Sequence, residues 1–322
     1  MERPYMRSIR TRFRAYHLGC SGSSFSYFAD GHFTMIEGRL TDDSRRQVEA
    51  ELEICGVEEA SGLHITSWDA DHCNKHELEE LLNMIRPRRI ECPGYNPIKD
   101  YGHGEDCLAM IAEYRSRRRN TGFIPEIRHI TPAYIGGLEH ASALAFNDMF
   151  YNPYHIVENA NDNSTVKLFR GGCFNVLSLG DVEDSLIGAR LRRCRILTRE
   201  TDVMILAHHG ADNGFTTKKF LQHIDPTVAI CSSNYDNQYD HPRQEIRDLL
   251  HEQGIRLMTT KTGDVIVRSV DNHTGVFEVV NLIAKSTEVS STAKFVSKKV
   301  HILDANGDAL RQRYAPRRRY PR

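Results

Sequence analysis

The chain has 322 residues, and its 42 Lys and Arg nearly balance its 43 Asp and Glu. A hydrophobic content of 40% and a charged content of 26% are typical of a globular protein and exclude a chain that is disordered throughout. No apolar run approaches the roughly 20 residues of a membrane-spanning helix, and the first residues, MERPYMRSIRTRFR, lack the apolar stretch of a secretory signal. We therefore expect a cytoplasmic protein without a membrane part.

Short apolar runs rich in β-branched residues alternate with helical patterns along the chain. We expect strands, in chain order, at residues 13–18, 33–36, 63–66, 89–92, 165–169, 174–179, 203–207, 228–231, 256–259, 265–270 and 276–280. We expect helices at residues 44–54, 75–85, 106–118, 217–224 and 243–252. This order predicts an α/β fold in which two sheets are covered by helices.

The pattern thins out after about residue 282, where Ser, Thr and Lys become frequent. We predict one domain over residues 1–281 and a C-terminal extension over residues 282–322, basic and flexible at its end. Residues 1–14 hold five Arg and one Glu (net +4), and residues 294–322 hold nine Lys or Arg and two Asp (net +7), which leaves −12 for the residues between them. Basic ends favour a polyanionic partner, although solvated ends would show the same charge.

The eight cysteines contain no C-x-x-C pair. Without a secretory signal, this spacing predicts reduced thiols rather than disulfides or a zinc ribbon. We expect most of these cysteines to act as small apolar core residues.

The segment at residues 63–72, LHITSWDADH, is the most informative part of the sequence. It reads as a short strand that ends in three side chains able to bind a metal, Asp69, Asp71 and His72. Carboxylates this close repel one another unless a cation lies among them. The segment therefore favours a divalent metal site, and an Asp-rich turn that caps the next helix is the alternative.

Three further segments place ionisable groups at strand ends. NVLSLGD ends in Asp181, DVMILAHHG contains His208 and His209, and YDHP places His241 just before a helix. Ligand sites of layered α/β folds gather at the ends of strands. A single such residue is more often structural, but four strand ends of this kind in one chain favour a common site.

The order of these segments resembles the metallo-β-lactamase-fold hydrolases and, more narrowly, the soluble nuclease-like domain of the ComEC DNA-uptake proteins. The match runs from about residue 13 to residue 267. It includes YHLGCSGSSF, TMIEG, TSWDADH, NDNSTVKLF, GCFNVLSLGD, LAHHGADNGF, SSNYDNQYDHPRQEI and TTKTGDVIV. The resemblance implies an αββα sandwich of two mixed sheets flanked by helices, and a metal-dependent hydrolase.

The resemblance also implies roles for individual residues. The implied metal ligands are Asp69, Asp71, His72, Asp181 and one of the pair His208 and His209. Asp71, Asp181 and His241 are the implied catalytic residues, with His241 as a proton donor or a phosphate contact; a structural residue at the helix entry is the alternative.

Several positions depart from the family pattern, among them residues 67 and 37. Ser67 stands where the first His of the metal motif is expected, and Glu37 where an Asp is expected. One metal position therefore looks complete and the other depleted. The carboxylate-rich ligand set favours Mn²⁺ or Mg²⁺ over Zn²⁺, with one or two ions per chain.

The predicted function is a metal-dependent phosphodiesterase or nuclease that acts on nucleic acid, with DNA favoured, through attack of metal-bound water. Arg runs within residues 86–89, 115–119, 190–195 and 311–319, the last interleaved with Tyr314, favour a nucleic-acid partner, while solvated charged faces are the alternative. We expect the chain to act alone, as a homo-oligomer, or as the effector subunit of a larger complex such as an antiviral defence assembly. Two other functions stay open, a nucleotide or cyclic-nucleotide hydrolase of the same fold and a catalytically degraded binding or scaffold subunit.

Overall fold

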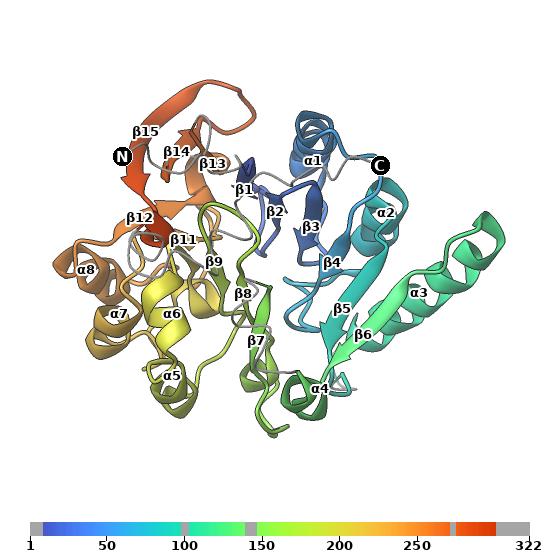
Figure 1. Ribbon diagram of the computed structural model, residues 1–322, viewed down its shortest axis with the longest axis horizontal. Helices are drawn as coiled ribbons and strands as arrows, with labels where there is room; N and C mark the ends of the chain where they lie inside the picture. Colours follow the sequence, from blue (N-terminus) through green and yellow to red (C-terminus); the bar gives the residue numbers. More distant parts are fainter. Residues whose placement is uncertain (1–8, 98–102, 139–146, 271–274, 301–322) are drawn as a thin grey trace, which may run out of the picture.

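Figure 1 shows a computed structural model of the chain, which describes residues 9–97, 103–138, 147–270 and 275–300. The first of its two sheets has nine strands in the order β15-β14-β13-β1-β2-β3-β4-β5-β6. In chain order these are β1 (Thr11–Ala15), β2 (Phe25–Ala29), β3 (His32–Ile36), β4 (Gly62–His64), β5 (Arg89–Pro93), β6 (Glu126–Ile130), β13 (Val265–Ser269), β14 (Val276–Leu282) and β15 (Val289–Val296).

The second sheet has six strands in the order β12-β11-β10-β9-β8-β7. They are β7 (Met149–Asn152), β8 (Val166–Phe169), β9 (Val176–Ser178), β10 (Val203–Ile205), β11 (Val228–Cys231) and β12 (Arg256–Thr259). Both sheets are mixed, because β3 to β6 and β9 to β12 pair in parallel while the remaining pairs are antiparallel.

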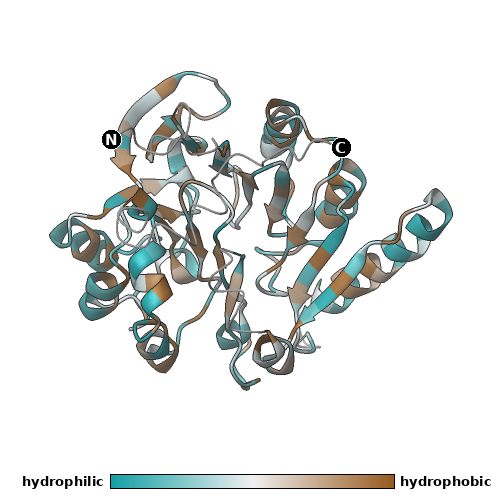
Figure 2. Ribbon diagram, viewed as in Figure 1, coloured by the Kyte–Doolittle hydropathy of each residue, from teal (hydrophilic) through white to brown (hydrophobic). Residues whose placement is uncertain are grey.

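Helices cover the outer side of each sheet. Beside the first sheet lie α1 (Asp42–Cys55), α2 (Lys75–Ile85) and α3 (His103–Arg118), with α4 (Pro132–Gly137) at its end (Figure 1). Beside the second lie α5 (Ser185–Leu191), α6 (Arg195–Glu200), α7 (Lys218–Ile224) and α8 (Gln244–Glu252). Figure 2 shows that outer helices such as α7 and α8 carry both hydrophilic and hydrophobic residues, as helices with one buried face do.

Three separate apolar cores show that the molecule has four layers. The first core packs Leu63 of β4 against Leu78 and Leu82 of α2. The second packs the outer face of the second sheet against α5 to α8. The third lies between the sheets, where Phe13 of β1 is in the same cluster as Phe169 of β8. The predicted αββα sandwich is therefore confirmed.

Parallel strands in both sheets point their carboxyl ends toward one edge of the sandwich. A buried ion pair joins the sheets elsewhere, because Lys167 of β8 places its Nζ 2.7 Å from Glu91 Oε2 of β5. His64 of β4 lies 3.2 Å from the same carboxylate. The contact between Lys167 and Glu91 crosses the interface between the sheets and helps to set their relative position.

The boundary predicted after residue 281 falls inside β14. β15 pairs with β14 in antiparallel register, and Lys299, which follows it, is fully buried and donates a hydrogen bond to the Arg170 carbonyl at 2.7 Å. Residues 282–300 thus extend the first sheet and pack on the second. Of the basic ends predicted at residues 1–14 and 294–322, residues 1–8 and 301–322 lie outside the described residues.

All eight cysteines are described, and none forms a disulfide; six are buried, as expected for small core residues. Within the described ranges, no helix has the length and apolar character that crossing a membrane would require.

Candidate metal centre

Three loops at the carboxyl ends of parallel strands form the candidate site. The loop after β4 carries Asp71 and His72, the loop after β9 carries Asp181, and the turn after β10 carries His209. Since β4 belongs to the first sheet and β9 and β10 to the second, the site lies where the edges of the two sheets meet. This is the location that the strand-end pattern predicted.

Asp71, His72, Asp181 and His209 form a compact cluster. One potential ligand atom from each residue lies within 4.8 Å of the others. His72 Nε2 is 2.9 Å from Asp181 Oδ1, and His209 Nε2 is 3.1 Å from Asp71 Oδ2. A cavity of about 10 Å³ borders His72, Asp181 and His209, which is the space that a single water-sized particle needs.

Glu37 orients His72. Its Oε1 lies 3.2 Å from His72 Nδ1 and also accepts a hydrogen bond from Thr66 Oγ1 at 2.6 Å, while its Oε2 accepts one from Thr66 N at 3.0 Å. Because Nδ1 faces Glu37, Nε2 faces the cluster. A carboxylate behind a histidine in this way fixes the ring orientation and raises the basicity of the exposed nitrogen.

A strained turn orients His209. Its Nδ1 lies 2.9 Å from the Ser232 carbonyl oxygen, so its Nε2 also faces the cluster. His208 and His209 both have left-handed backbones, with φ of 44° and 52°, which costs about 1–2 kcal/mol for each such residue. Gly210 follows with φ of 79°, and a Cβ there would approach Pro242 Cβ to 2.7 Å. Strain of this kind persists where the surroundings hold it and is concentrated at functional sites.

The charges of the cluster balance only when it binds protons or a cation. Burial lowers the pKa of His72, but the carboxylates of Asp181 and Glu37 outweigh this effect and raise its pKa well above the usual value. Burial likewise raises the pKa of Asp181, and the adjacent His72 and His209 outweigh it and lower that pKa. The carboxylates thus favour positive charge on the neighbouring imidazoles, and a divalent cation is able to supply that charge instead.

The residues present fit a single divalent ion. Two imidazole nitrogens and two carboxylates surround one small volume. His72 Nε2 is buried and close to Asp181, yet it makes no hydrogen bond of acceptable geometry. Such a nitrogen, which faces a common point with the other donor atoms and has no hydrogen-bond partner, suits a metal ligand.

Two predicted ligands lie outside this cluster. Asp69 accepts a hydrogen bond from Ser67 Oγ at 2.9 Å, and burial raises the pKa of its carboxyl. His208 Nδ1 lies 2.6 Å from Glu183 Oε1, and the His208 side chain is 28% exposed. The geometry thus favours His209 over His208 as the ligand, a choice that the sequence left open.

His241 lies beside the cluster among aromatic rings. Its ring centroid is 6.4 Å from that of His209, with the planes 14° apart, and 5.6 Å from that of the exposed Tyr239. Burial, followed by repulsion from His209 and His208, lowers the pKa of His241 to about 4. The ring is therefore neutral near pH 7, which suits a hydrogen bond to phosphate better than the alternative role of proton donor.

Sequence comparison identifies relatives of the chain. No family model matches it. It is 35% identical over 231 residues to ComE operon protein 3 of Bacillus subtilis (strain 168), an alignment that covers 70% of this chain and 26% of that protein. It is 30% identical over 110 residues to Competence protein ComA of Neisseria gonorrhoeae, covering 32% of this chain and 15% of that protein. Over 70% of its length the chain is therefore similar to part of ComE operon protein 3, and its four layers match the sandwich expected from the sequence.

The chain thus spans about a quarter of the length of the first relative. Among solved structures, the metallo-β-lactamase fold protein YhfI from Bacillus subtilis aligns with 80% of this chain and 100% of its own, with 9% sequence identity and a TM-score of 0.45. The fold assignment rests on the four layers and the strand order described above.

The departures from the ComEC pattern at residues 37 and 67 have different consequences. Glu37 still supplies a carboxylate behind His72, so its replacement of Asp preserves a positioning group. Ser67 is buried and bonds to Asp69, so that position lacks the imidazole of a second ligand set. Sequence reasoning recognised both substitutions but missed the positioning role of Glu37 and of the Ser232 carbonyl, because neither contact joins residues near in sequence.

Proposed function

We propose that the chain is a metal-dependent hydrolase that cleaves phosphodiester bonds in nucleic acid, with DNA as the favoured substrate. The observation that carries this proposal is the cluster of Asp71, His72, Asp181 and His209 with both Nε2 atoms directed inward. The resemblance to the nuclease-like domain of ComEC DNA-uptake proteins supports the choice of substrate.

Each residue of the site has a distinct task in this proposal. Asp71, His72, Asp181 and His209 hold the ion, which when bound supplies Lewis-acid polarisation of a phosphoryl oxygen and lowers the pKa of water. Glu37 and the Ser232 carbonyl keep the two imidazoles in the orientation that binding requires. His241, neutral near pH 7, donates an N–H to a phosphate oxygen and anchors the substrate.

We propose one tightly held ion per chain, Mn²⁺ or Mg²⁺ rather than Zn²⁺, because half of the ligand set consists of carboxylates. Treatment with EDTA should abolish cleavage, and Mn²⁺ but not Zn²⁺ should restore it. Recovery with Zn²⁺ alone would contradict this choice of metal.

The decisive experiment is to incubate the metal-loaded protein with single-stranded DNA, double-stranded DNA, RNA and cyclic nucleotides, and to compare Asp181→Ala with the wild type. The variant should be folded and inactive. Asp212→Ala is the matched control, because Asp212 is an exposed carboxylate in the loop after His209, and it should be fully active. Full activity of Asp181→Ala would refute the assignment of Asp181 as a metal ligand. Cleavage of cyclic nucleotides alone would show that the substrate is a small molecule rather than nucleic acid.

We further propose a cytoplasmic location and action either as a homo-oligomer or with a protein partner, for example as the effector subunit of a defence complex. These expectations derive from the sequence. Light scattering on the purified protein measures the oligomeric state.

A further inference from the structure

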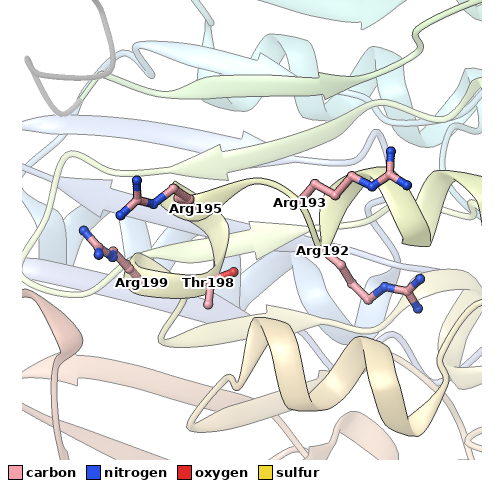
Figure 3. A pocket seen from close by; sticks show the side chains of 5 residues that line it. All are labelled: Arg192, Arg193, Arg195, Thr198 and Arg199. Carbon is pink, nitrogen blue, oxygen red and sulfur yellow. The ribbon is translucent and has the colours of Figure 1, made fainter.

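The corner between α5 and α6 carries a strongly cationic hollow with a volume of about 180 Å³. Four arginines and one threonine line it: Arg192, Arg193, Arg195, Arg199 and Thr198. We refer to these five residues as the arginine hollow. Figure 3 shows Arg195 and Arg199 close together at one end, while Arg192 and Arg193 extend away from each other at the other end. The positive charge is thus spread along the hollow rather than gathered around one point.

The four guanidinium groups are not neutralised by acidic side chains. In the part of the chain that the structure describes, none of them lies within ion-pair distance of a carboxylate. The carboxylates nearest in sequence have other contacts. Glu200 lies 2.9 Å from Arg170, Asp184 caps α5 by accepting a hydrogen bond from Leu186 N, and Glu183 contacts His208.

Two of the other arginine runs in the sequence differ in this respect. In the run at residues 86–89, Arg88 pairs with Glu59 at 3.0 Å and Arg89 pairs with Glu91 at 2.9 Å. In the run at residues 115–119, Arg117 pairs with Glu79 at 3.3 Å, and Arg118 pairs with the same Glu59. Those faces carry compensating charge, so the α5–α6 corner attracts a polyanion more strongly than they do.

The arginine hollow follows the metal-centre loop along the chain. α5 begins at Ser185, four residues after Asp181, and its seven residues rise by roughly 10 Å. Strand phosphates of B-form DNA repeat every ~3.4 Å along the axis, so about three nucleotides would match the length of α5. On α5, Arg190 lies over the ring of Tyr154, 5.2 Å from its centroid, and that tyrosine is 59% exposed.

We propose that the arginine hollow binds the phosphodiester backbone of the nucleic-acid strand that is cleaved at the metal centre, an inference that rests on the proposed function. Guanidinium groups spread along the hollow suit successive phosphates, because each planar fork binds phosphate oxygens in a bidentate manner. Tyr154, backed by Arg190, offers an exposed ring on which a base stacks. The chain's own C-terminal residues are unsuitable occupants, because residues 301–322 contain six Arg and two Asp.

The test replaces all four arginines of the hollow with Gln and measures binding of a labelled, hydrolysis-resistant phosphorothioate 20-mer by fluorescence anisotropy. The matched control replaces Arg46, Arg115, Arg119 and Arg256, four exposed arginines outside the hollow, with Gln. Both variants lose four charges, and both should hydrolyse a small chromogenic phosphodiester at the wild-type rate.

The magnitude follows from counterion release. Each contact with a single strand contributes about 0.7 to the slope of log K against log salt, so loss of four contacts should flatten the slope by about 2.8. At 0.1 M salt, loss of two to four contacts weakens binding by roughly 25-fold to 600-fold on the same relation. The control variant should keep a slope close to that of the wild type.

Equal slopes for the two four-residue variants would overturn the proposal, as would absence of binding to the 20-mer by the wild type. Equal competition by polyglutamate would also overturn it, because the hollow would then recognise acidic protein. The fourfold variant could lose binding specifically while the wild-type protein hydrolyses no phosphodiester. That result would support the arginine hollow as a binding site and refute the proposed function instead. If the fourfold variant melts early, the pairs Arg192 with Arg193 and Arg195 with Arg199 are replaced separately. Each should remove about half of the slope change, and no change in either would overturn the proposal.

Discussion

Replacing Glu37 with Gln tests whether the carboxylate behind His72 prepares the metal centre. In the wild type this buried carboxylate faces three donors, Thr66 N, Thr66 Oγ1 and His72 Nδ1, at 3.0, 2.6 and 3.2 Å. An amide has one acceptor oxygen, and its NH₂ group must face either Thr66 N or His72 Nδ1. Thr66 Oγ1 also lies 3.2 Å from His72 Nδ1, so Glu37→Gln leaves a buried donor without an acceptor when the NH₂ group faces Thr66 N, and in either orientation it removes the negative charge behind His72.

Two effects of this change have predictable sizes. An unsatisfied buried donor costs about 1–3 kcal/mol of unfolding free energy. Loss of the group that orients a ligating histidine weakens metal affinity by roughly 10-fold to 100-fold. At a metal concentration of 100 times the wild-type Kd, the ion stabilises the wild type by about 2.7 kcal/mol, and a 100-fold weaker variant by about 0.4 kcal/mol.

Calorimetric titration with Mn²⁺ measures the affinity, and thermal unfolding with and without metal measures the stabilisation. Glu51→Gln is the control, because Glu51 is equally buried and lies 2.7 Å from Arg12 and 3.2 Å from Arg14, away from the centre. It should lose stability and retain its metal affinity. Wild-type affinity in Glu37→Gln would refute the positioning role.

Two further predictions concern the histidine pair and the buried ion pair. Calorimetry should show that His209→Gln loses metal binding and that His208→Gln keeps it, because only His209 directs a nitrogen into the cluster. The reverse result would make His208 the metal ligand. Burial would raise the pKa of Glu91, but Lys167 and His64 outweigh this effect and hold that pKa well below its usual value. The contribution of the ion pair to the free energy of unfolding is therefore present above about pH 4 and is lost on acidification. Lys167→Met should therefore lose about 3–5 kcal/mol at pH 7, and the deficit in urea unfolding should shrink between pH 5 and pH 3. A deficit that grows on acidification would contradict this account.

Periodicity predicted the elements that have one buried face. The stripe of Leu78, Leu81, Leu82 and Ile85 places α2 at Lys75–Ile85, and all four side chains are fully buried. Buried apolar strands such as β9, β10 and β11 were also found, with ends shifted by up to two residues. In these elements the local pattern and the tertiary environment favour the same structure.

The elements that sequence reasoning missed lack such a pattern. β15, VSSTAKFV, is an edge strand with most side chains partly or fully exposed, so its Ser and Thr residues resembled a flexible extension. β2, FSYFA, is buried on both faces and shows no alternation of apolar and polar residues. α5 and α6 have seven and six residues, too few to display a helical stripe among their arginines.

The candidate site was predictable in its location but not in its internal geometry. The strand-end positions of Asp71, His72 and Asp181 indicated where ligands would meet, and the structure brings them together. The choice between His208 and His209 depends on two consecutive left-handed residues, which a sequence without an obligatory glycine at either position does not reveal. The positioning contact of Glu37 depends on the alignment of β3 with β4, a tertiary feature.

Net charge illustrates why the structure was needed to choose among the arginine runs. By sequence, the runs at residues 86–89, 115–119 and 190–195 have similar density, and each fits either a solvated face or a polyanion site. In the fold, acids on other elements neutralise much of the first two, as Glu59 does for both Arg88 and Arg118. Around the hollow, the carboxylates nearest in sequence have other partners, of which Glu200 with Arg170 is the most deeply buried. A chain with nearly balanced charge can therefore attract a polyanion at one corner, because the field there depends on unpaired charge rather than on the total.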